Sequence, residues 1–224
     1  MTGKIPWEGH AVTVRVTRAG PEPPGRDAGV RFQIRFGANE EAPMGRNYLV
    51  VVDMQHDFVD GALGTPEAQA IAAGVTQAAR DFDGTVVFTK DTHYSDYLQT
   101  QEGRNLPVEH CIHGTHGWEL MEDLQAVRDE RDSFVFEKTT FGSLDLAMWL
   151  AEENVAEPIE SIELIGLCTD ICVVSNAMVI KAWIPEVPIS VDASLCAGVT
   201  PAAHEAALAT LASCQVKVLN GAND

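Results

Sequence analysis

The sequence predicts a three-layer α/β/α fold with a mostly parallel sheet of about six strands. Short, largely apolar segments alternate with helix patterns along most of the 224-residue chain, which is typical of a parallel sheet covered by helices on both faces. A chain of this length can bury one good core. Several apolar segments also end in polar or reactive residues, as expected where strand ends form a site.

The first expected elements occupy the segment from residue 48 to residue 89. Residues 48–52 and 85–89 are β-rich runs, and between them residues 68–82 read as a helix entered through the capping pair Thr65-Pro66. The polar interval 91–115 has little regular pattern and follows a strand end. We therefore expect this interval to line the functional site.

The second half of the chain repeats the alternation. Strands are expected at 133–136 and 162–166, with helices at 144–152 and 170–182. The remaining elements are a strand at 188–191, a helix from the Thr200-Pro201 cap to about residue 212, and a strand at 216–219.

Composition excludes several classes of protein. The net charge of −18 argues against nucleic acid or an anionic membrane as partner, and the sequence has no apolar run long enough to span a bilayer. Residues 1–10 lack the apolar stretch of a signal peptide. The five cysteines are odd in number and include no CxxC pair, so we expect a reducing cytoplasm and no disulfide framework.

The first 46 residues differ in composition from the rest, and we expect a catalytic domain at 47–224. Residues 1–46 hold seven basic and five acidic side chains in an otherwise acidic chain. Alternating apolar residues at 12–16 and 32–36 indicate an amphipathic hairpin, which would have to pack on the body or on a neighbouring subunit of a homo-oligomer. The alternative is that Met44 is the natural start and the extension is disordered.

The most informative segment is 166–172, which closes an apolar run and opens a helix pattern with Thr169 and Asp170 as capping residues. Cys172 falls in the first helical turn, where the helix dipole stabilises a thiolate. A single cysteine is more often a buried structural residue. However, the other predicted strand ends carry Asp53, then Asp91 and His93, then Lys138, and their convergence at one sheet edge favours a catalytic site.

The chain carries six motifs in the order found in one known family. They are VDMQHDF at 52–58, DTH at 91–93, HCIHGT at 110–115, KTTF at 138–141, GLCTDIC at 166–172 and DASLCAG at 192–198. In these motifs the chain resembles the isochorismatase-like cysteine hydrolases, which have a Rossmann-like sheet, and is most similar to the nicotinamidases. The resemblance covers about residues 48–219.

The resemblance implies a catalytic triad of Asp53, Lys138 and Cys172. Asp53 would accept the thiol proton and Lys138 would stabilise the thiolate, because a free thiol is mostly protonated at neutral pH. Cys172 would then attack an amide carbonyl and form a thioester. By the same resemblance, the backbone N–H groups of Cys168 and Cys172 form the oxyanion hole, with a cis peptide at Leu167-Cys168.

The resemblance also implies a metal site of Asp91, His93 and His110. Two imidazoles and a carboxylate suit a divalent transition metal, zinc first, with iron or manganese as alternatives. His113 and His116 are interpreted as loop residues. The substrate-pocket candidates are Phe58, Tyr97, Phe141 and Ile171.

Some positions depart from the usual nicotinamidase pattern. His56 replaces an Asn common in the first motif, Ile171 stands where an aromatic residue or His is frequent, and Leu106 precedes Pro107 in place of an aromatic residue. The leading hypothesis is a nicotinamidase that converts the small amide nicotinamide to nicotinate and ammonia in NAD salvage. Alternatives are a related amidase or N-carbamoyl hydrolase, a non-catalytic binding module, and a redox pair of Cys168 and Cys172.

Overall fold

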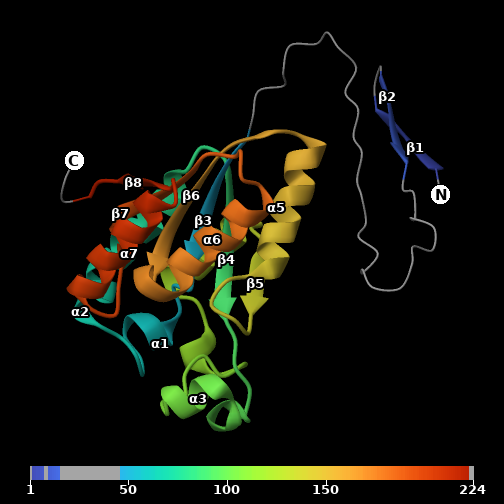
Figure 1. Ribbon diagram of the computed structural model, residues 1–224. Helices are drawn as coiled ribbons and strands as arrows, with labels where there is room; N and C mark the ends of the chain where they lie inside the picture. Colours follow the sequence, from blue (N-terminus) through green and yellow to red (C-terminus); the bar gives the residue numbers. More distant parts are fainter. Residues whose placement is uncertain (1, 8–9, 16–45, 222–224) are drawn as a thin grey trace, which may run out of the picture. The chain divides into compact units, whose positions relative to one another are not determined.

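The computed structural model describes residues 2–7, 10–15 and 46–221, which fall into two compact units divided after residue 42 (Figure 1). In the N-terminal unit, β1 (Thr2–Trp7) pairs antiparallel with β2 (His10–Arg15). The predicted hairpin instead joined residues 12–16 to residues 32–36, and the latter segment lies outside the described residues. The partner of β2 is therefore an earlier strand that the sequence analysis missed.

The larger unit is built on a six-stranded sheet with strand order β5-β4-β3-β6-β7-β8. Every neighbouring pair is parallel, which confirms the predicted sheet. The strands are β3 (Arg46–Val52), β4 (Thr85–Asp91), β5 (Val135–Lys138), β6 (Ile159–Leu167), β7 (Ile189–Ala197) and β8 (Lys217–Leu219).

Helical segments connect the strands. They are α1 (His56–Val59), α2 (Pro66–Asp81), η1 (Tyr97–Gln99), α3 (Gln101–Asn105), η2 (His116–Trp118), α4 (Glu122–Glu130), α5 (Leu144–Ala156), η3 (Thr169–Val173), α6 (Val174–Trp183) and α7 (Pro201–Ser213). Among the described residues, no helix is both long and apolar enough to cross a membrane.

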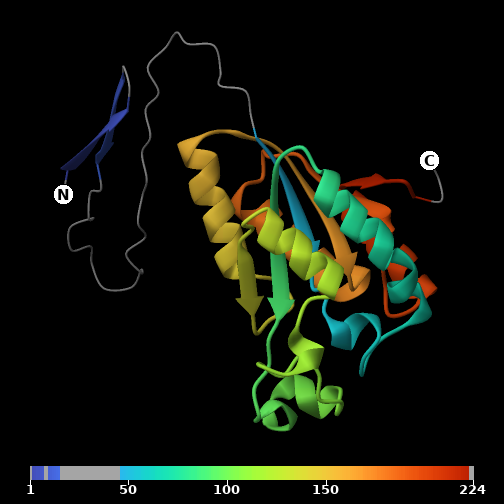
Figure 2. The ribbon, with the colours of Figure 1, turned by 180° about the vertical axis from the view of Figure 1, so that it is seen from behind.

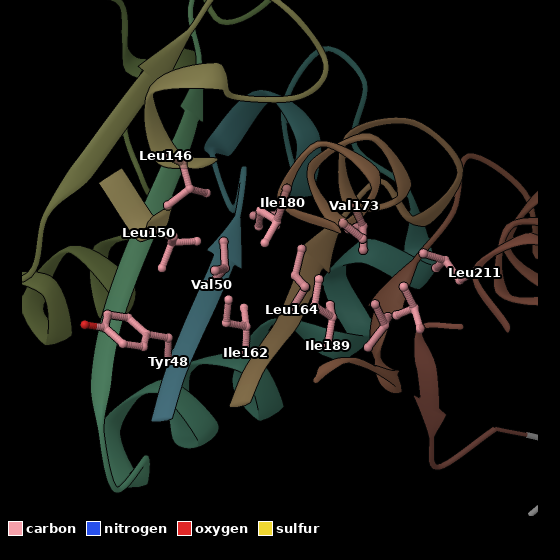
Figure 3. Close-up of a cluster of buried hydrophobic side chains, with 14 of the residues drawn as sticks. Tyr48, Val50, Leu146, Leu150, Ile162, Leu164, Val173, Ile180, Ile189 and Leu211 are labelled. Atoms are coloured by element: carbon pink, nitrogen blue, oxygen red, sulfur yellow. The ribbon is translucent and has the colours of Figure 1, made fainter. Parts of the chain in front are cut away.

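The sheet is buried on both faces, and its central strand shows why. In β3, Tyr48 and Val50 belong to one apolar cluster, whereas Leu49 and Val51 belong to the other, because successive side chains point to opposite faces. Side chains from α5, α6 and α7 complete the first cluster (Figure 3). Side chains from α2 and α4 complete the second cluster, and Figure 2 shows the ribbons of these two helices on that face of the sheet.

Side-chain caps explain where three of the longer helices begin. The hydroxyls of Thr65, Ser143 and Thr200 accept backbone N–H groups at the starts of α2, α5 and α7. The predicted cap at Thr169 and Asp170 is wrong, since the Thr169 hydroxyl lies 2.8 Å from His204 Nδ1 and Asp170 accepts the Val199 N–H. Residues 169–173 form a π-helical turn instead.

The interval after β4 is more regular than the sequence indicated. It contains η1, α3 and η2, followed by α4, which the sequence analysis also missed. In Figure 1, α1 and α3 lie at the edge of the sheet to which the arrowheads of β4 and β5 point. This edge therefore carries both the strand ends and the segments that surround them.

Glycine is required where β6 ends beside β3. Gly166 has φ +112°, and a Cβ there would lie 2.2 Å from the Val52 carbonyl oxygen. A side chain at this position would push apart the two strands that carry Asp53 and the Cys172 turn.

Candidate active site

The ends of four neighbouring strands bring together the residues predicted to carry the chemistry. Asp53 follows β3, Asp91 ends β4, Lys138 ends β5, and Cys172 lies in η3 after β6. The Lys138 ammonium lies 2.7 Å from Asp53 Oδ2, 3.3 Å from Asp91 Oδ1 and 3.5 Å from Cys172 Sγ. Lys138 thus contacts both predicted parts of the site, the triad and the metal cluster.

Asp53 is completely buried in a turn with a left-handed φ of +48°. Its Oδ1 accepts a 2.6 Å hydrogen bond from the Thr89 hydroxyl, and its Oδ2 faces Lys138. Burial raises the pKa of the Asp53 carboxyl, an effect that Lys138 opposes and Asp91 reinforces. A carboxylate with a raised pKa is a better proton acceptor than an ordinary aspartate.

Cys172 is a buried thiol at the same point. Burial raises the pKa of the thiol, as does the neighbouring Asp53 carboxylate, while Lys138 opposes the shift. This corrects the expectation from the helix dipole, because the burial penalty on a thiolate outweighs the stabilisation expected at the start of a helix. The resting thiol therefore keeps its proton, and an acceptor is needed when the sulfur reacts.

Asn176 fixes the turn that carries Cys172, and the sequence analysis missed it. Its side-chain NH₂ donates to the Cys172 carbonyl at 2.8 Å and to the Phe141 carbonyl at 3.2 Å, and its Oδ1 accepts from the Ser143 N–H at 2.9 Å. The only available signal was an amide residue four positions after Cys172 in an otherwise apolar helix pattern.

The predicted oxyanion residues lie at the junction of β6 and η3. The Leu167-Cys168 peptide is cis, as the resemblance implied. Cys168 is partly buried and lines the same cavity as Cys172. All five cysteines are free thiols, including Cys168 and Cys172.

The predicted metal ligands also converge. Asp91, His93 and His110 form a cluster with Glu102, in which the candidate ligand atoms lie within 4.8 Å of one another. His93 Nε2 is 3.0 Å from Asp91 Oδ2 and 3.6 Å from Glu102 Oε1. Glu102 comes from α3 and was not predicted, although it belongs to the interval expected to line the site.

The donor set fits a divalent transition metal. His110 Nδ1 lies 2.8 Å from the Val108 carbonyl oxygen; donation of its hydrogen there leaves the Nε2 lone pair facing the cluster. The buried His93 Nε2 has no well-directed hydrogen-bond partner among the described residues. Two imidazoles and two carboxylates in one buried place match a zinc, iron or manganese site.

A cavity of about 150 Å³ opens beside the thiol. Cys172, Asp91 and His110 contribute to its wall, and so do the predicted pocket residues Phe58, Phe141 and Ile171. The fourth predicted pocket residue, Tyr97, does not line this cavity. It is fully buried against the rings of His93 and His110, with its hydroxyl bonded to the Leu106 carbonyl, and it lines an adjoining hollow.

The fold and this site define a hydrolase. Residues 47–223 match the Isochorismatase domain model, and the chain belongs to this family. The curated protein "Uncharacterized isochorismatase family protein PncA" of Bacillus subtilis (strain 168) is 32% identical over 143 residues, which are 58% of this chain and 75% of that protein.

The chain is also similar in sequence and in fold to solved structures of amide hydrolases. The nicotinamidase/pyrazinamidase PncA from Bacillus subtilis is 27% identical, with a TM-score of 0.67 over 78% of this chain and 100% of that one. Pyrazinamidase of Pyrococcus horikoshii in complex with zinc is 26% identical (TM-score 0.62; 79% and 99% covered). N-carbamoylsarcosine amidase from Thermoplasma acidophilum is 27% identical (TM-score 0.62; 78% and 95% covered). The chain is accordingly a hydrolase of amide C–N bonds.

Proposed function

We propose that the chain is a metal-containing cysteine amidohydrolase, and specifically a nicotinamidase that converts nicotinamide and water to nicotinate and ammonia. The position of Lys138 carries the proposal, because its ammonium contacts Asp53, Cys172 and the metal-cluster carboxylate Asp91 beside a small cavity. This arrangement joins a nucleophile, its base and a substrate-anchoring cluster.

The thioester route follows from the contacts around Cys172. As its sulfur attacks the amide carbon, the thiol proton passes to Asp53, and the Lys138 cation offsets the negative charge on both groups. The backbone N–H groups of Cys168 and Cys172 donate to the developing oxyanion. Asp53 then returns the proton to the leaving nitrogen, so that ammonia departs and a thioester remains.

Hydrolysis of the thioester uses the same groups in reverse. Asp53 takes a proton from an incoming water, the water oxygen attacks the thioester carbon, and the thiol leaves as Cys172 recovers its proton. The product is a carboxylic acid. Every proton in the two half-reactions therefore passes through Asp53, whose raised pKa suits both directions.

The metal cluster would orient the substrate. Asp91, His93, Glu102 and His110 would hold the ion, and zinc is supported by the zinc complex of the Pyrococcus horikoshii pyrazinamidase. When bound, a divalent ion supplies a Lewis acid that can take the lone pair of a ring nitrogen or a water. The cluster and Cys172 contribute to one cavity, which supports binding of a heteroaromatic amide between them.

Apolar side chains would hold the substrate ring. Phe58 and Phe141 contribute aromatic rings to the cavity wall, and Leu106 and Ile171 contribute aliphatic surface. A flat pyridine ring suits such a wall, because aromatic pairs stack or meet edge to face. This supports nicotinamide over an aliphatic amide as the preferred substrate.

A panel of amides tests the assignment. We expect ammonia release from nicotinamide and pyrazinamide, weak release from benzamide because it lacks a ring nitrogen, and none from the Cys172→Ala variant. Chelator treatment followed by zinc addition should abolish and restore the activity. Turnover of benzamide as fast as that of nicotinamide would contradict the role given to the metal cluster.

An N-carbamoyl hydrolase is the second candidate, favoured by the similarity to N-carbamoylsarcosine amidase. Such an enzyme releases ammonia through the same thiol chemistry, so N-carbamoylsarcosine belongs in the panel. Preference for it over nicotinamide would select this alternative.

The cellular setting is part of the proposal. A nicotinate product would feed pyridine nucleotide metabolism and NAD salvage, and five free thiols support a reducing cytoplasm. Exposed apolar side chains at Leu144, Met148 and Phe134 support a homo-oligomer. The net charge of −18 supports the absence of a nucleic-acid partner.

A further inference from the structure

We propose that His56, His116 and Glu122 form a second divalent transition-metal site, separate from the cluster beside Cys172. His56 begins α1, His116 begins η2 and Glu122 begins α4, and their candidate ligand atoms lie within 4.8 Å of one another. The proposal is independent of the substrate assigned above, because none of the three residues lines the cavity or contacts the triad.

His56 is arranged as a metal-binding histidine. Its ring is buried, and its Nδ1 lies 3.0 Å from Asp60 Oδ1. Donation of the Nδ1 hydrogen to this carboxylate leaves a lone pair on Nε2, which lies 3.4 Å from Glu122 Oε2. A carboxylate behind the far nitrogen is the usual support for a metal-bound imidazole, since it fixes the tautomer and raises the basicity of the ligand.

His116 supplies the second imidazole. Its ring centroid lies 4.0 Å from that of His56, with 33° between the ring planes. Two imidazoles and one carboxylate are a common ligand set for zinc, and three protein ligands leave a position for water. His116 and Glu122 are exposed, so an ion can reach the site from solvent.

Backbone hydrogen bonds join the segment of His56 to the segment that leads into Glu122. The His56 N–H donates to the Glu119 carbonyl at 3.0 Å, and the Met121 N–H donates to the Met54 carbonyl at 3.0 Å. Gln55 and Leu120 form an isolated antiparallel bridge between the same two segments. The two backbone segments are therefore ordered before an ion binds, and only the side chains of His116 and Glu122 would have to be fixed by the ion.

The two metal sites share no ligand, but a hydrogen bond links the segments that carry them. Asp57, next to His56 in α1, accepts a 2.7 Å hydrogen bond from the Cys111 N–H. Cys111 follows His110, a residue of the cluster beside Cys172. An ion at the second site would cross-link α1 to the start of α4 and so steady the segment that positions His110.

Metal stoichiometry tests the proposal. Untagged full-length protein is dialysed against micromolar zinc, and bound zinc is measured by elemental analysis for the parent, His116→Gln and His113→Gln. His113 is the matched control, since it is an exposed histidine in the same loop outside the cluster. We expect His116→Gln to hold one zinc ion fewer per chain than the parent, and His113→Gln to equal the parent.

A second readout separates this site from the cluster beside Cys172. His93→Ala should lose one ion while keeping the ion at His56, and adding His116→Gln to it should remove that remaining ion. Asp60→Asn should weaken the second site by about 10- to 100-fold, the effect typical of losing a histidine's supporting carboxylate. Equal zinc contents in the parent and His116→Gln, or equal losses in His116→Gln and His113→Gln, would overturn the proposal.

Discussion

Replacing Asn176 by alanine should both destabilise the protein and slow catalysis. The substitution removes three hydrogen bonds, two donated to the carbonyls of Cys172 and Phe141 and one accepted from the Ser143 N–H. At about 1 kcal/mol for each hydrogen bond, the loss is roughly 3 kcal/mol of unfolding free energy, and unpaired buried groups add to it. For a domain of this size that corresponds to a fall in Tm of about 6–12 °C.

The catalytic effect should appear mainly in kcat, because Asn176 positions the Cys172 turn and does not line the cavity. We expect kcat for nicotinamide to fall at least tenfold with a smaller change in KM, as small displacements of a nucleophile are costly. Denaturant unfolding and an ammonia-release assay measure the two effects.

Asn154→Ala provides the control for Asn176→Ala. The Asn154 side chain accepts one hydrogen bond, from the Ile159 N–H at the opposite end of β6. We expect a loss of about 1 kcal/mol or less and unchanged kcat. If Asn176→Ala behaved like Asn154→Ala in both assays, the reasoning about the Cys172 turn would be refuted.

The remaining predictions concern the triad, the metal and the N-terminal segment. Cys172→Ala should lower turnover by several orders of magnitude without unfolding the protein. Adding Lys138→Ala should lower turnover little further, because the residues act as a unit. Retention of more than about one per cent of the parent's turnover by Cys172→Ala would contradict the triad assignment. His93→Ala should lose the ion beside Cys172. The zinc affinity of the parent should fall as the pH drops, because an imidazole must be neutral to bind the ion. Zinc titrations at two pH values measure this change. Deleting residues 1–43 should leave kcat within about twofold, because every candidate site residue follows residue 46, and should lower Tm or change the oligomer if the segment packs on the protein. An unchanged Tm and an unchanged mass in solution would indicate that residues 1–43 pack neither on the rest of the chain nor on a second subunit.

The strands of the sheet and most of the longer helices were predictable as elements because they depend on local sequence pattern. The apolar run before Asp53 and the capping pair Thr65-Pro66 each gave the correct type of element, with boundaries displaced by a few residues. The six motifs gave Asp53, Lys138 and Cys172 as one group, and the structure brings them together.

What escaped prediction depends on contacts between distant segments. Glu102 joins the metal cluster through the placement of α3, and Asn176 reaches back to Ser143 and Phe141. Thr169 looked like a helix cap, but its hydroxyl is close to His204, which is far along the chain. Local propensity holds no information about such partners.

The contacts of Lys138 limit which substitutions the metal cluster and the triad can accept independently of each other. One ammonium is shared by the Asp53 and Asp91 carboxylates, so any change in the charge near Asp91 alters the field at the Cys172 sulfur. If the proposed mechanism holds, thermodynamic reciprocity requires that thioester formation change the affinity for a bound ion by the same factor by which the ion favours the thioester. In that case neither half of the site can change alone, and a substitution that adapts the proposed metal cluster to another ion will also change the reactivity of the proposed nucleophile.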